Sequence, residues 1–227
     1  LENYAKCCLF DYSYKYFYGD GYGKEFTILN LPENRDTDER HLYFTACLLT
    51  FYQQLYLYET QKDELADFNL EKPLWVFVGN KVNDDDSDIL IVLTFLAQFL
   101  NDRERTEQWI SDLLHGTARI LDTKDRNIFD KRFLPISKYS GTQIYQDILK
   151  RLFNTDSPQR LKLANVKAVK GELALRVGSA DPFGLINIGD DSKFINQTAD
   201  GQSHFDLESD EFGGSLFPTI NKKESTL

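Results

Sequence analysis

The spacing of apolar side chains predicts four helices. Apolar residues recur at intervals of three and four, or form runs longer than a strand needs, in four stretches of the chain. These stretches are Asp36–Glu59, Ile89–Leu100, Arg103–Leu114 and Thr142–Phe153. Thr37 or Asp38 is expected to cap the first helix, and Ser87 or Asp88 the second, because short polar side chains there bond to free backbone N–H groups.

A different pattern predicts strands. Leu74–Gly79 is a continuous apolar run after Lys72-Pro73, as in a strand of a parallel sheet that is covered on both faces. Residues 160–169 and 172–177 alternate apolar and polar side chains around Lys170-Gly171, which predicts a half-exposed hairpin. A third short strand is expected at Phe183–Ile188, and the Gly-, Ser- and acid-rich stretch Asp200–Gly214 indicates a turn-rich connection. Strand, polar turn and helix in succession predict an α/β fold.

Composition and charge narrow the function classes. The 227 residues are 41% hydrophobic, which is too apolar for a disordered chain. The net charge of -10 argues against a surface that binds duplex DNA by electrostatics alone. The three cysteines do not form a recognisable disulfide framework. The longest apolar run is shorter than the ~20 residues of a membrane span. No signal peptide is recognised. A cytoplasmic protein is expected, and the absence of methionine indicates an excised or altered sequence.

Local motifs for catalysis are incomplete. Gly23-Lys24 is the nearest approach to a phosphate-binding loop, but Glu25 follows it and Tyr18 occupies the first glycine position. Asp63-Glu64-Leu65-Ala66 resembles an acidic box without the buried strand before it.

The histidines lack metal-ligand spacing. The acidic group near the second helix has two interpretations, a Mg²⁺ site or helix-capping charge. The residues concerned are His41, His115, His204, Asp84, Asp85, Asp86 and Asp88.

An aromatic tract near the start of the chain offers a candidate binding surface. Tyr14, Tyr16 and Tyr18, with nearby Lys15 and Lys24, are candidates for stacking on single-stranded bases. The alternative is a packed aromatic cluster, because only two lysines accompany many rings. Both interpretations remain open at this point.

Three strings carry a family resemblance. They are Asp11-Tyr-Ser-Tyr-Lys-Tyr-Phe-Tyr-Gly-Asp-Gly-Tyr-Gly-Lys24, Glu71-Lys-Pro-Leu-Trp-Val-Phe-Val-Gly79 and Asp181-Pro-Phe-Gly-Leu-Ile-Asn-Ile-Gly-Asp190, with Gly213-Gly-Ser-Leu-Phe-Pro-Thr-Ile-Asn221 as an extension. In this order the chain resembles bacterial DEAD/DEAH-box helicases of superfamily 2 that are related to type III restriction Res subunits.

The resemblance implies an internal fragment of an ATP-dependent DNA helicase. It implies that residues 1–70 leave the first helicase lobe, 71–158 begin a second RecA-like lobe, and 159–227 form a β-rich addition. The ATP and Mg²⁺ sites would lie in the rest of the parent, so no cofactor is expected in this fragment and no residue of it is assigned to catalysis. Gly79, Asn80 and Lys81 would lie near DNA, or would simply form the turn after the strand. The implied partners are DNA, the remaining lobes and a modification or nuclease subunit.

Two rival hypotheses accompany this interpretation. The first is a free-standing acidic module that binds a protein partner, which is motivated by the net charge of -10. The second is a metal-dependent nuclease that uses the acidic residues 84–88, in which Asp86→Ala would abolish cleavage of DNA.

Overall fold

The structure is a computed structural model, and it describes residues 12–22, 36–68, 70–79, 88–118, 120–122, 124–166, 171–188 and 205–212. The chain divides into two compact units, Leu1–Arg35 and Asp36–Leu227. In the first unit, the described element is the short helix α2 (Tyr14–Gly19), which follows Ser13. The domain boundaries expected after residues 70 and 158 stay predictions.

The helices of the second unit agree with the sequence pattern. Its elements are α3 (Thr37–Thr60), α4 (Lys62–Leu65), η1 (Ala66–Phe68), α5 (Asp88–Asn101), α6 (Arg103–His115), η2 (Leu134–Ile136) and α7 (Gly141–Phe153). The four predicted helices are confirmed as α3, α5, α6 and α7, each within one residue at either end. These elements were located well because helical spacing, and the length of an apolar run, are properties of neighbouring residues.

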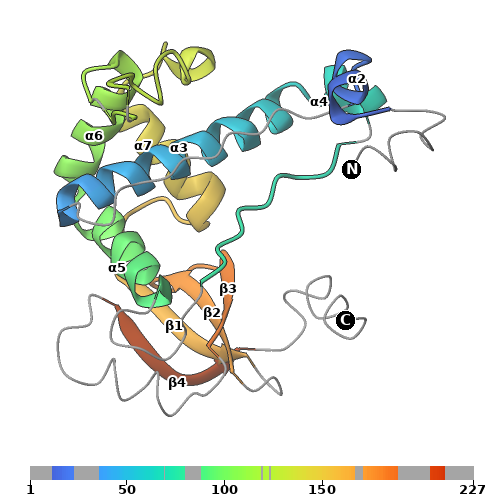
Figure 1. Cartoon of the computed structure of the whole chain (residues 1–227). Helices are drawn as coiled ribbons and strands as arrows, with labels where there is room; N and C mark the ends of the chain where they lie inside the picture. Colours follow the sequence, from blue (N-terminus) through green and yellow to red (C-terminus); the bar gives the residue numbers. More distant parts are fainter. Residues whose placement is uncertain are drawn as a thin grey trace, which may run out of the picture. The chain divides into compact units, whose positions relative to one another are not determined.

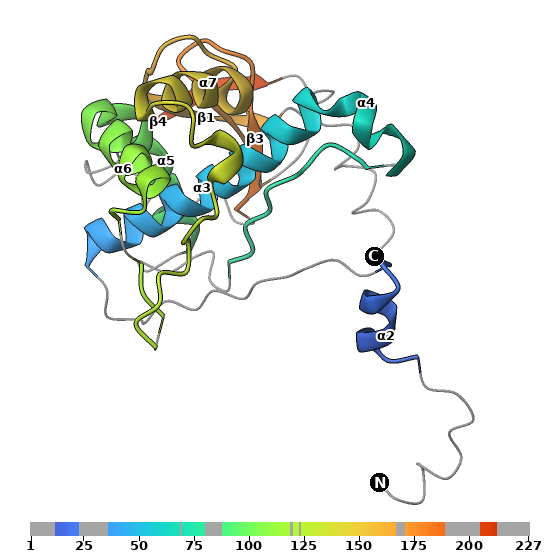
Figure 2. The same ribbon diagram turned by 90° about the horizontal axis from the view of Figure 1, so that it is seen from above.

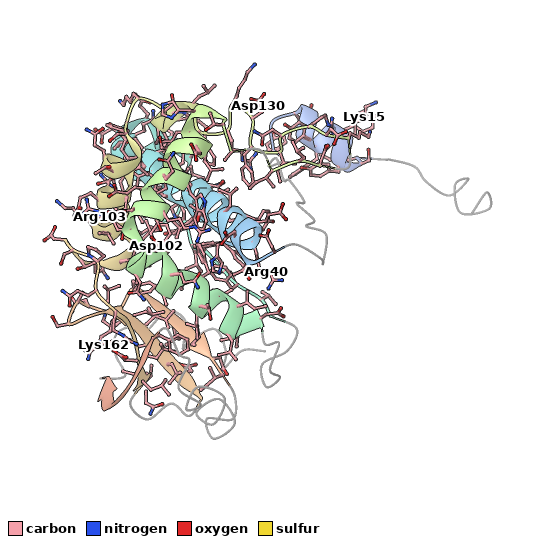
Figure 3. All side chains as sticks on the ribbon, turned by 90° about the vertical axis from the view of Figure 1, so that its left-hand side faces the viewer. Lys15, Arg40, Asp102, Arg103, Asp130 and Lys162 are labelled. Atoms are coloured by element: carbon pink, nitrogen blue, oxygen red, sulfur yellow. The ribbon has the colours of Figure 1, made fainter. Side chains whose placement is uncertain are left out.

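Capping side chains fix where these helices begin. The predicted cap of α3 was wrong: Asp36, not Thr37 or Asp38, has the extended backbone of a cap, and its Oδ1 accepts the Glu39 N–H at 2.8 Å. In α7, Ser140 and Gln143 bond to each other's backbone N–H groups, which is a capping box. Asp102 caps α6 next to Arg103, and both are labelled in Figure 3.

Four strands form one mixed sheet in the described part of the chain. They are β1 (Leu161–Val166), β2 (Glu172–Val177), β3 (Gly184–Asn187) and β4 (Asp206–Phe212), in the order β3-β2-β1-β4. β2 pairs antiparallel with β1 and β3, while β4 lies parallel to β1. The mixed α/β class is therefore as predicted, and so are the three antiparallel strands.

Two expectations about this sheet were wrong. Residues 206–212 form β4 and are not a turn-rich connection, because main-chain pairing with β1 does not depend on side-chain type. The hairpin is largely buried and not half-exposed, because β1 and β2 are the central strands of the sheet.

Aromatic contacts join the helices to the sheet. Phe99 on α5 lies 5.5 Å from Tyr145 and 5.8 Å from Phe153, both on α7, measured between ring centroids. Phe153 in turn meets Phe183, just before β3, edge-on at 4.8 Å. Figure 1 shows α5 next to the sheet, and Figure 2 shows α3, α5, α6 and α7 lying together. The core of the second unit thus runs from the helices to the sheet.

The predicted strand Leu74–Gly79 is not part of this sheet. Residues 71–79 carry no regular secondary structure, and Figure 1 draws them as an extended tube without a strand arrow. The parallel pairing expected for this run is found instead between β1 and β4. An apolar pattern favours a strand, but a strand also needs a neighbour with which to share hydrogen bonds.

Candidate functional site

The run Leu74–Gly79, here called the bare segment, presents two different faces. Leu74, Val76 and Val78 are 73%, 64% and 92% exposed. On the other side, Trp75 is half-buried and Phe77 is 42% exposed, and the two rings contact each other at 4.4 Å between centroids. Successive side chains of an extended chain point to opposite sides. One face of the bare segment is therefore aliphatic and open, and the other is aromatic.

Trp75 attaches the bare segment to α3. The Trp75 ring stacks on Phe51 with 5.8 Å between centroids and 27° between planes. Lys72, just before the bare segment, lies 3.8 Å from a carboxylate oxygen of Glu59, also on α3. An exposed ion pair of this kind contributes little to stability. The stacked ring is the main attachment.

The backbone of the bare segment is also unpaired within the described residues. No hydrogen bond joins the main chain of Leu74–Gly79 to another described segment. The run from Pro73 to Gly79 contains no charged side chain. An uncharged, extended stretch with open aliphatic side chains and open backbone groups has the chemistry of a β-strand that lacks a sheet.

Of the residues predicted to contact DNA, Gly79 ends the bare segment, and Asn80 and Lys81 come directly after it. Gly79 passes close to the start of α5, because a Cβ built on it would lie 3.1 Å from Cβ of Asp88. Asn80 and Lys81 lie outside the described residues, as do Asp84, Asp85 and Asp86. The DNA contact and the acidic metal site therefore stay predictions.

The tyrosines predicted to stack on bases lie on α2. Tyr14, Tyr16 and Tyr18 are 52%, 53% and 41% exposed, and the rings of Tyr14 and Tyr18 approach to 5.9 Å. Tyr12 donates a 2.6 Å hydrogen bond to Asp20, and this bond raises the pKa of the Tyr12 phenol. The Tyr14 and Tyr18 rings contact each other and all three rings remain exposed, which agrees with both the packed-cluster and the stacking interpretation.

A polar cluster between α3 and α7 was not predicted. Tyr52 and Arg151 both donate to Oδ2 of Asp147, at 2.6 and 2.7 Å, and Arg151 also pairs with Glu59. Burial, followed by the bond to Asp147, raises the pKa of Tyr52. Next to it, the hydroxyls of Tyr56 and Tyr139 lie 2.8 Å apart.

This cluster holds two helices together. Tyr52, Tyr56 and Glu59 lie on one side of α3 because they are spaced by three and four residues, as Asp147 and Arg151 are on α7. In the sequence, that spacing indicates which side chains share one side of each helix. The sequence does not reveal that the two helices meet there.

A small cavity lies where the starts of α3 and α6 approach α5. Its volume is about 200 Å³, and its lining consists of Thr37, Asp38, Gln98, Asp102, Arg105, Thr106 and Trp109. Arg105 pairs with Asp38 and lies over the Trp109 ring at 4.8 Å. The guanidinium thus joins α3 to α6, and this arrangement accounts for the charged groups without a ligand.

The histidines and the cysteine of the described residues do not have the surroundings of a metal site or of a reactive thiol. Among them, no three His, Cys, Asp or Glu side chains gather as a metal site would require. His41 is buried on α3, and Nδ1 of His115 lies 2.7 Å from the Ser111 carbonyl oxygen. Burial raises the pKa of the Cys47 thiol, which disfavours the reactive thiolate.

Comparison with known proteins found no similar family, curated protein or solved structure. Among the described helices, none is both long and apolar enough to span a membrane.

Proposed function

We propose that this chain is an internal part of a cytoplasmic, ATP-dependent DNA helicase or translocase similar to the Res subunits of type III restriction enzymes. It contributes framework and a contact to a DNA strand through Gly79, Asn80 and Lys81. ATP and Mg²⁺ bind to other parts of the parent enzyme, and the parent acts together with a modification or nuclease subunit.

The observation that carries the proposal concerns the middle string of the resemblance. In the family, that string belongs to a strand inside the second RecA-like lobe. In this chain the same residues form the bare segment, whose aliphatic side chains are exposed and whose backbone is unpaired within the described residues. A framework piece that is completed by the rest of a lobe accounts for both facts.

ATP hydrolysis tests the proposal. The product of the complete reading frame around this chain should hydrolyse ATP and do so faster with DNA, whereas the isolated chain should release no phosphate under either condition. Steady turnover by the isolated chain contradicts the proposal, and so does a complete product that is inert with and without DNA.

The DNA contact is tested separately in the complete product. Lys81→Ala should weaken the binding of a labelled single-stranded oligonucleotide and lower the salt dependence of that binding, because one phosphate contact is lost. Lys150→Ala is the matched control, since Lys150 lies on α7 and pairs with Asp156 at 3.5 Å. Equal effects of the two substitutions contradict a contact at Lys81.

A second candidate function is a free-standing acidic module that binds a protein. The net charge of -10 favours it, and the bare segment would then contact the partner directly. Stop codons on both sides of this chain in its gene would support the module. A phosphate-binding loop upstream and an arginine-finger motif downstream would support the motor.

A further inference from the structure

We draw no further inference here: the strongest candidate, the small cavity at the starts of α3 and α6, carries none because its Arg105 and Asp38 pair with each other and its buried Thr106 donates to the Phe99 carbonyl oxygen, so none of these groups points to a ligand.

Discussion

The apolar runs Leu74–Gly79 and Ile89–Leu100 lie close together in the sequence, but the first has exposed aliphatic side chains and the second has mostly buried ones. In α5, Leu93, Phe95 and Leu96 are at most 5% exposed. In the bare segment, Leu74, Val76 and Val78 are at least 64% exposed. An apolar sequence thus indicates that its side chains favour burial. Burial occurs only where other elements of the fold pack against them.

The side chains of α5 are buried because a helix requires fewer contacts from the rest of the fold than a strand does. An α-helix pairs its own backbone groups, so α5 requires only apolar surfaces, and α7 and β1 provide them. An extended run needs a neighbouring strand as well as apolar cover. The aromatic side of the bare segment finds α3, but within the described residues its backbone finds no partner.

Leucine truncation in each run should give the largest contrast. Leu93→Ala removes a side chain that is 1% exposed and should lower the free energy of unfolding by about 2–5 kcal/mol. Leu74→Ala removes one that is 73% exposed and should change it by less than about 0.5 kcal/mol. Urea denaturation of the isolated chain measures both. Similar losses would mean that the bare segment is buried in solution.

Alkaline pH should destabilise the packed region next. Burial raises the pKa of Tyr145 to about 12, and that of Tyr43 to about 12, from an ordinary 10. A raised phenol pKa favours folding below pH 10, and this contribution is lost as pH rises through 12. For fully buried Tyr145 the loss is roughly 2–3 kcal/mol.

The pH dependence is measured as the free energy of unfolding between pH 8 and 12. Tyr145→Phe should flatten part of the decline, because the variant has no phenol to ionise. Its hydroxyl lies 3.4 Å from the carbonyl oxygens of Phe99 and Leu100, so some stability is lost at all pH values. An unchanged slope in the variant would exclude Tyr145 as the titrating group.

A single methyl group should test how closely the packed helices meet. A Cβ at Gly141 would collide with the Glu107 carbonyl oxygen and lie 3.1 Å from the Ser111 amide nitrogen, both on α6. Gly141→Ala should therefore cost about 1–3 kcal/mol, seen as a lower melting temperature. Thr142→Ala, which removes only an exposed bond to Glu107, should cost less. The reverse order would contradict this close approach.

The smallest effect is expected where the bare segment meets α3. Lys72→Ala removes an exposed ion pair with Glu59 and should change the free energy of unfolding by less than about 0.5 kcal/mol. Trp75→Ala removes the stacked ring and should instead speed proteolysis near residue 75. If Lys72→Ala had the larger effect on proteolysis, the ion pair and not the ring would hold the segment.

Much of the fold was predictable where structure is local. The spacing of Leu42, Leu49 and Tyr52 predicts α3, and Lys170-Gly171 between alternating runs predicts the hairpin, because helical and strand periods are properties of neighbouring residues. The cap at Asp36 was missed by one residue, since several short polar side chains there were equally suitable.

The candidate site was predictable only in part. Leu74–Gly79 was recognised as important from its apolar character and family resemblance, but its exposure was not foreseen. The cluster of Tyr52, Asp147 and Arg151 joins helices that are far apart in the chain, and no local pattern encodes that meeting.

By itself, the sequence determined the helices, the antiparallel hairpin and the mixed α/β class, because helical and strand periods depend on neighbouring residues. Only the tertiary structure decided that residues 206–212 pair with β1 and that Leu74, Val76 and Val78 stay open. Those outcomes depend on which distant segments come together and share hydrogen bonds, and a local pattern of apolar and polar residues contains no such information.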